Sequence, residues 1–124
     1  MDERRAAEVT DLITIVKQLG QLSRDLDDAV ERLGEIEEIA VDLEADYKLA
    51  FAQAFKEAVG AVEDRKQTAV IETDAAFRLS GKAAAGVRKQ KEHVKALHAR
   101  IEVGRSMQST ARAEIALVNA GVGS

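Results

Sequence analysis

The stretch AAAGVRKQKEHVKALHARIEVGRSMQSTARAEIALV, residues 83–118, decides how this chain is expected to fold. Its apolar and small residues recur at alternating steps of three and four, a seven-residue repeat that places them on one seam of a helix. Because the middle of the seam lacks large aliphatic side chains, we expect this helix to need a packing partner. The seam consists of Val87, Gln90, Val94, Leu97, Ile101, Gly104, Gln108, Ala111, Ile115 and Val118.

Charge is unevenly distributed along the chain. Residues 78–112 hold nine basic and two acidic side chains, whereas residues 1–47 have a net charge of −9. Such a division between the two halves indicates an anionic partner for the basic half. A second interpretation is that the acidic and basic halves pair with each other inside one helical bundle.

Composition restricts the fold and the location. The 124 residues include no proline and no cysteine, and aromatic residues make up 3% of the chain. Long helices can therefore run without a forced break, and disulfides and thiolate metal ligands are excluded. No apolar run approaches the ~18 residues that a membrane span needs, so we expect a cytoplasmic protein, in the host cytoplasm if it is phage-encoded, without a membrane partner.

The apolar repeat in the first half of the sequence predicts an acidic helical or coiled-coil region over residues 1–62. Its repeat changes register at Gly34, which either overwinds a continuous coil or marks a bend, and we favour a bend or a short break there. A second helix should then run to about residue 62, with Tyr47, Phe51 and Phe55 as core contacts. The predicted seam before the break consists of Val9, Leu12, Val16, Leu19, Ser23, Leu26, Val30 and Leu33.

Residues 63–82 lose the helical period, and we predict a β-hairpin near 67–80 or an extended connector. The alternative is a helix that continues through this segment. The basic helical region then occupies residues 83–124. The expected fold is mostly α, a single domain of long coiled-coil-like helices that forms a homo-oligomer, because one short chain cannot bury such long apolar stripes. The predicted oligomerisation residues are Val94, Leu97, Ile101, Ile115 and Val118.

Residues suited to catalysis are scarce, and we expect a protein that is not an enzyme and has no cofactor or metal. His93 and His98 are five residues apart, so they diverge around a helix instead of converging as metal ligands. Basic side chains remain as the functional candidates, since each one that neutralises a phosphate gives sequence-tolerant affinity for nucleic acid. The predicted DNA-binding residues are Arg65, Lys66, Arg78, Lys82, Arg88, Lys89 and Lys91.

Residues 63–118 resemble the small phage recombination mediators of the UvsY type. The segment KQTAVI at 66–71, followed by Asp74 and FRLS at 77–80, is similar to the short extended segment of that family. The segment VKALHARI at 94–101, with Arg105 and RAE at 112–114, is similar to its final helix. The acidic region 1–47 departs from the family pattern, which leaves its role open.

The resemblance implies a non-catalytic accessory of homologous recombination. Such a protein binds single-stranded DNA, assembles into a homo-oligomer that can be a ring, contacts a single-strand-binding protein and helps a RecA-type recombinase load. Two other functions fit the same residues. One is a coiled-coil adaptor or scaffold that does not bind nucleic acid, and the other is a helical oligomer that sequesters a small anionic ligand such as a nucleotide.

Overall fold

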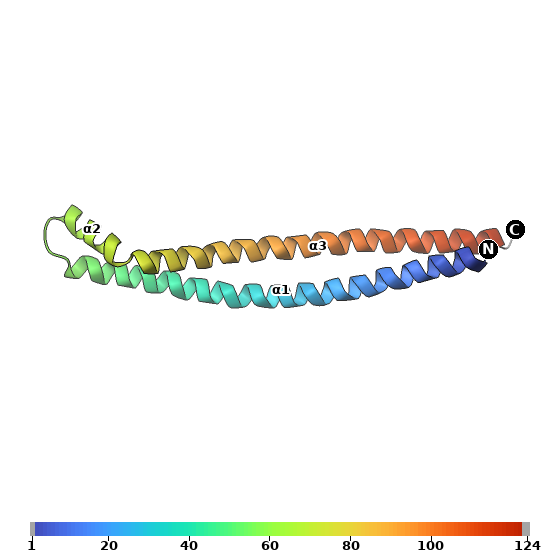
Figure 1. The fold of residues 1–124 in the computed structure, drawn as a ribbon, viewed down its shortest axis with the longest axis horizontal. Coiled ribbons are helices and arrows are strands. Elements are labelled where there is room, and N and C mark those ends of the chain that lie inside the picture. The colour runs from blue at the N-terminus through green and yellow to red at the C-terminus, as the bar shows by residue number, and fades with distance from the viewer. Residues whose placement is uncertain (1, 123–124) are drawn as a thin grey trace. The chain divides into compact units, whose positions relative to one another are not determined.

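The computed structural model describes residues 2–122, which form three helices and no strand (Figure 1). Helix α1 covers Asp2–Glu57, α2 covers Val62–Glu72 and α3 covers Asp74–Val122. Acidic residues in the first turn of α1 and a lysine in its last turn match the helix dipole. The prediction of a mostly α protein is therefore confirmed.

Two compact units divide the chain, and both long helices contribute to each of them. The terminal unit combines residues up to Val30 with residues from His93 onward, and the central unit comprises Glu31–Glu92. In the terminal unit the start of α1 lies beside the end of α3 (Figure 1). Leu19 lies against Gly104 and Glu8 bonds to Glu114, so the two helices are antiparallel.

The α3 seam predicted from the sequence is confirmed by the exposure of its residues. All ten predicted seam residues are buried or half-buried, and Leu97 and Ile101 keep only 2% and 6% of their surface exposed. The same alternation of three and four extends back through Ala83, Ser80 and Ala76 to the buried Thr73. The repeat therefore accounts for α3 from its first turn onward.

The α1 seam differs from the predicted one in every second position. Leu12, Leu19, Leu26 and Leu33 are half-buried as expected, but Val9, Val16 and Val30 are exposed by 39%, 46% and 50%. The residues that alternate with the leucines in the structure are Glu8, Ile15, Leu22 and Ala29. The β-branched residues Val9, Val16 and Val30 therefore lie on one flank of the leucines and not in the seam.

This correction also removes the predicted break at Gly34. With Ala29 in the seam, the step to Leu33 is a four and the step to Ile36 is the expected three, so the register never changes. Helix α1 accordingly continues through Gly34 and ends at Glu57, five residues before the predicted end of the second helix.

A short turn connects α1 and α2. Gly60 has a φ of +117°, a backbone conformation that side-chain-bearing residues rarely adopt. Ala61 supplies the N-cap position of α2 without a side-chain cap, and its carbonyl accepts a hydrogen bond from the Arg65 amide at 3.0 Å. The negative charges of Glu63 and Asp64 in the first turn of α2 interact favourably with the positive end of the helix dipole.

The predicted hairpin at 67–80 is wrong, because these residues are helical on both sides of Thr73. The Thr73 amide and hydroxyl both donate to the Ala69 carbonyl, at 3.0 and 2.6 Å, and its carbonyl accepts from the Phe77 amide at 2.9 Å. This buried threonine thus ends α2 and starts α3. A lone hairpin is marginal in water, whereas a helix lets Ala69 become fully buried.

Two glycine substitutions test the continuity of α1 and the closeness of the seam. Gly34→Ala should raise the free energy of unfolding by about 1 kcal/mol, because alanine favours the helix and nothing lies within 4 Å of its Cβ. In Gly104→Ala the new Cβ would lie 2.5 Å from Leu19 Cδ2 and 3.2 Å from Leu19 Cγ, so Leu19 must move. We expect that variant to be roughly 1–3 kcal/mol less stable than Gly34→Ala. Urea unfolding followed by circular dichroism measures both, and equal effects would contradict the seam.

Candidate nucleic-acid interface

All seven predicted DNA-binding residues lie in the central unit, but the structure does not bring them together. Arg65 lies on α2 and is half-buried. Its Nε and Nη2 atoms donate to the Phe55 carbonyl at 3.3 and 3.1 Å, and its guanidinium lies 4.5 Å from the centre of the Phe55 ring. It therefore satisfies one of the carbonyls left open at the end of α1, which gives it a role in the fold.

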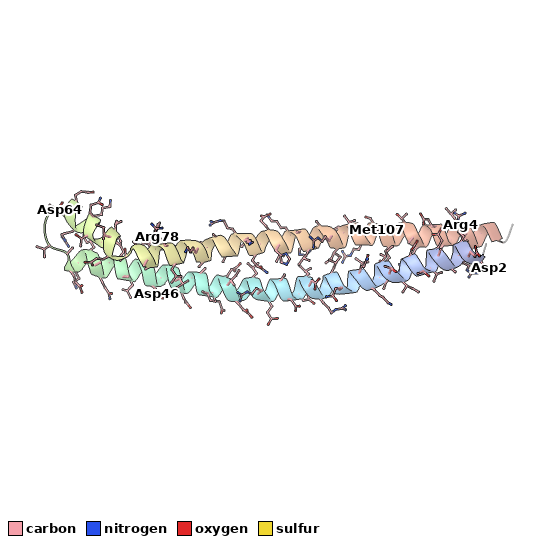
Figure 2. All side chains as sticks on the ribbon, viewed as in Figure 1. Asp2, Arg4, Asp46, Asp64, Arg78 and Met107 are labelled. Atoms are coloured by element: carbon pink, nitrogen blue, oxygen red, sulfur yellow. The ribbon has the colours of Figure 1, made fainter. Side chains whose placement is uncertain are left out.

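Lys66 and Arg78 occupy different helices. Lys66 is exposed on α2. Arg78 is exposed on α3 (Figure 2). Its Nε donates to the Asp74 carboxylate at 2.9 Å. The spacing of four residues between Asp74 and Arg78 was visible in the sequence and is the usual spacing of a helical ion pair. Lys66 lies on a different helix from the other exposed cations of the set, whereas Arg78 lies one turn before Lys82 on α3.

Lys82, Arg88 and Lys89 form an exposed positive group, which we call the α3 basic surface. All three side chains are exposed on the half of α3 that faces away from its seam. Within the described chain none of the three takes part in an ion pair. Lys91 lies to one side of this surface, in a groove of about 430 Å³ that Glu37 and Glu44 also line.

Acidic residues of α1 do not cover the α3 basic surface. Each of the five ion pairs found within the two units joins residues three or four apart on one helix, so none links α1 to α3 in the described residues. The α1 segment of the central unit nevertheless carries eight acidic and three basic side chains. Packed helix axes are about 8–10 Å apart, close to the Debye length at physiological salt, so these carboxylates weaken the positive potential of α3.

Phe77 does not join the α3 basic surface. Its ring is 57% exposed and packs against Tyr47, with 5.4 Å between ring centres and 59° between ring planes. Tyr47 in turn meets Phe51 edge-on at 6.3 Å. Tyr47, Phe51 and Phe55 are all half-buried, which agrees with their interpretation as packing contacts.

The five predicted oligomerisation residues belong to the terminal unit. Leu97, Ile101 and Val118 are buried, and Val94 and Ile115 are half-buried. They share the α3 seam with Gly104 and Ala111, which adjoin Leu19 and Ile15 of α1. Their side chains are thus engaged in packing within the chain.

A carboxyl pair in the terminal unit was not recognised from the sequence. Glu8 occupies a seam position of α1, and only 15% of its side chain is exposed. A hydrogen bond with Glu8, together with the charge of Glu8, raises the pKa of Glu114 above its ordinary value. Arg4 reaches Glu8 at 3.7 Å and partly offsets this repulsion. The signal in the sequence is Glu8 itself, an acidic residue at a seam position of α1 where an apolar residue is expected.

Two other classes of site are absent from the described residues. No group of three His, Cys, Asp or Glu side chains lies close enough together to hold a metal ion between residues 2 and 122. In the same range, no helix combines the length and the apolar character that crossing a bilayer requires.

Comparison with known proteins gives no match to a family model, a curated protein or a solved structure.

Substitution of Arg65 should separate a structural role from a DNA-binding role. Arg65→Ala removes two hydrogen bonds and the contact with the Phe55 ring, so we expect a loss of about 1–2 kcal/mol in the free energy of unfolding. Lys66→Ala is the matched control, because Lys66 is exposed on the next position of α2 and should change stability by less than ~0.5 kcal/mol. Chemical unfolding measures both variants, and a neutral Arg65→Ala would exclude the structural role.

The pH dependence of unfolding should report the Glu8–Glu114 pair. Because the pKa of Glu114 is raised on folding, the folded chain binds more protons, and this pair lowers stability as pH rises above the ordinary glutamate range. Glu114→Gln removes the repulsion, so its melting temperature should exceed that of the unaltered chain by a margin that grows from pH 4 to pH 7. Glu102→Gln, which loses an ion pair with Arg105 at 3.1 Å, should show no such gain.

Proposed function

We propose that this chain is a non-catalytic accessory of homologous recombination that binds single-stranded DNA, acts as a homo-oligomer and helps a RecA-type recombinase load. The α3 basic surface is the observation that carries this proposal. Lys82, Arg88 and Lys89 are exposed cations on neighbouring turns of one rigid helix, and no carboxylate in the described chain neutralises them by direct contact.

The chemistry of this surface favours contact with phosphates over reading of bases. Lysine and arginine on an exposed helix supply mobile positive charge, which tracks a phosphate backbone without sequence preference. Since Phe77 lies apart from the α3 basic surface, base stacking has no aromatic platform beside these three residues. The expected binding is therefore electrostatic and strongly dependent on salt.

The acidic segment of α1 gives the central unit two different outer surfaces. A polyanion can approach the outward side of α3, whereas the α1 side repels it. We assign the α1 side to protein partners, of which a single-strand-binding protein and the recombinase are the candidates that the UvsY-type resemblance supplies. The extended segment of that family corresponds here to α2 and the start of α3, so the proposal rests on the α3 basic surface and not on a shared strand.

A coiled-coil adaptor or scaffold without nucleic-acid binding is the second candidate function. It is favoured by the uninterrupted seven-residue repeat in both long helices. It is also favoured by the composition of the central unit, which carries thirteen acidic and ten basic side chains. The two functions differ in one respect, which is whether an oligonucleotide binds to the α3 basic surface.

Reversal of the three charges tests the proposed function. The Lys82→Glu/Arg88→Glu/Lys89→Glu variant should lose binding to a fluorescein-labelled oligo-dT at 50 mM NaCl, with Kd raised at least tenfold in an anisotropy titration. For the unaltered chain, log K against log salt should fall with a slope of about −2, the value for three phosphate contacts on a single strand.

The matched control reverses three basic residues elsewhere, as Arg5→Glu/Lys17→Glu/Arg24→Glu in the terminal unit, with the same change in net charge. It should retain most of the binding, and circular dichroism should show equal helix content in both variants. Equal losses in the two variants would mean that net charge alone matters. An unaltered chain that does not bind the oligonucleotide would favour the scaffold.

A further inference from the structure

The terminal unit leaves large apolar side chains exposed on both long helices. Val9, Ile13 and Val16 of α1 are exposed by 39%, 50% and 46%. Val103 and Met107 of α3 are exposed by 60% and 50%, and Figure 2 labels Met107 on α3. Exposed apolar residues that recur at helical spacing form continuous stripes, which usually mark an interaction surface.

These two stripes lie on opposite sides of the terminal unit. A groove of about 740 Å³ runs between the helices, with Ile15, Val103 and Met107 among its lining residues. It identifies one side of the seam, which we call the groove face. Val9, Ile13 and Val16 lie on the other side of the leucine seam of α1, and we call this side the ridge face.

Charge on the two faces is complementary. The groove is also lined by Asp11, Glu102 and Glu114, and no basic residue lines it. One arginine, Arg100, lies in the adjoining smaller groove of about 280 Å³.

On the ridge face, the flanking positions of α3 are occupied by the exposed residues Arg105 and Arg112. Arg105 also bonds to Glu102 within its own helix at 3.1 Å, whereas Arg112 has no ion pair in the described chain. An apolar ridge beside cations therefore matches an apolar groove beside carboxylates.

We propose that the ridge face of one copy of this chain docks into the groove face of a second copy. Because the two faces are different, such contacts are heterologous, and each added copy leaves one ridge and one groove free. Repetition gives a ring if the rotation closes and an open chain if it does not. The inference rests on the homo-oligomer in the proposed function and assigns its interface, but it is independent of DNA binding.

Two double variants test the interface, each with one face blocked. Ile13→Glu/Val16→Glu places carboxylates on the ridge, and Val103→Glu/Met107→Glu places them at the groove. All four side chains are about half exposed or more, so the helices should tolerate the changes. Light scattering after size-exclusion chromatography, without DNA, should give a multiple of 13.4 kDa for the unaltered chain and a monomer for each variant alone.

Mixing the two variants distinguishes this interface from others. A one-to-one mixture should form a dimer, because the intact groove of one variant accepts the intact ridge of the other, and both ends are then blocked. If the same face were used on both copies, an isologous interface, mixing the two variants would not restore the assembly that either one had lost. Thr10→Glu/Ala113→Glu adds two carboxylates at exposed positions away from both faces and should assemble like the unaltered chain.

Three results would overturn the proposal. These are a monomeric unaltered chain, a mixture that stays monomeric while its components are folded, and a single-face variant that still assembles by itself. If the unaltered chain assembles but does not bind the oligonucleotide, the proposed DNA role is overturned and this interface is not affected. Raising NaCl from 0.1 to 1 M should lower the assembled mass, because the flanking charges are exposed and salt screens them.

Discussion

Apolar packing between α1 and α3 is the interaction on which both units depend. Isolated helices are marginal in water, and most helical stability comes from packing of an apolar face. The seam here relies on small residues: Ala29, Ala54 and Ala111 are among its most buried side chains. Small residues let the helices approach closely, as Leu19 does at Gly104, but they bury little apolar surface. The two helices therefore lie close together in this fold while burying little apolar surface between them.

The same seam determines which side chains reach solvent. Residues that pack between the helices are withdrawn from solvent, as Leu97, Ile101 and Val118 are. Residues on the outward half of α3 remain open, and Lys82, Arg88 and Lys89 are among them. Apolar residues beside the seam are also left exposed, because two helices cannot cover stripes wider than one face. The charged surface and the apolar flanks are thus two consequences of one pattern.

The sequence predicted α3 from residue 83 onward, because only one set of positions there follows the seven-residue repeat, but it assigned residues 74–82 to a hairpin or connector. In α1, valines and isoleucines flank the leucines on one side while Glu8 and Ala29 lie in the true seam, so hydrophobicity alone favoured the wrong partners. Packing against α3 selects the second of these two registers of α1, and the sequence of α1 alone does not show which helix it packs against. At Thr73 the β-branched residues suggested strands, but hydroxyl and amide bonds to Ala69 join two helices there. For the candidate site, exposure of the basic residues was expected, whereas the capping role of Arg65 depends on a contact with Phe55 that no local pattern reveals.

The antiparallel arrangement of the terminal unit also affects how the chain can be reconnected. Since Glu8 bonds to Glu114, the start of α1 and the end of α3 lie at the same end of that unit. Residues 58–61 form the turn between α1 and α2, and Val59 in this turn is 92% exposed. A short linker between the start of α1 and the end of α3, with new ends opened at Gly60, would give a circular permutant in which all three helices remain whole. Such a permutant would place a fused reporter beside α2 while α1 and α3 stay joined through the linker.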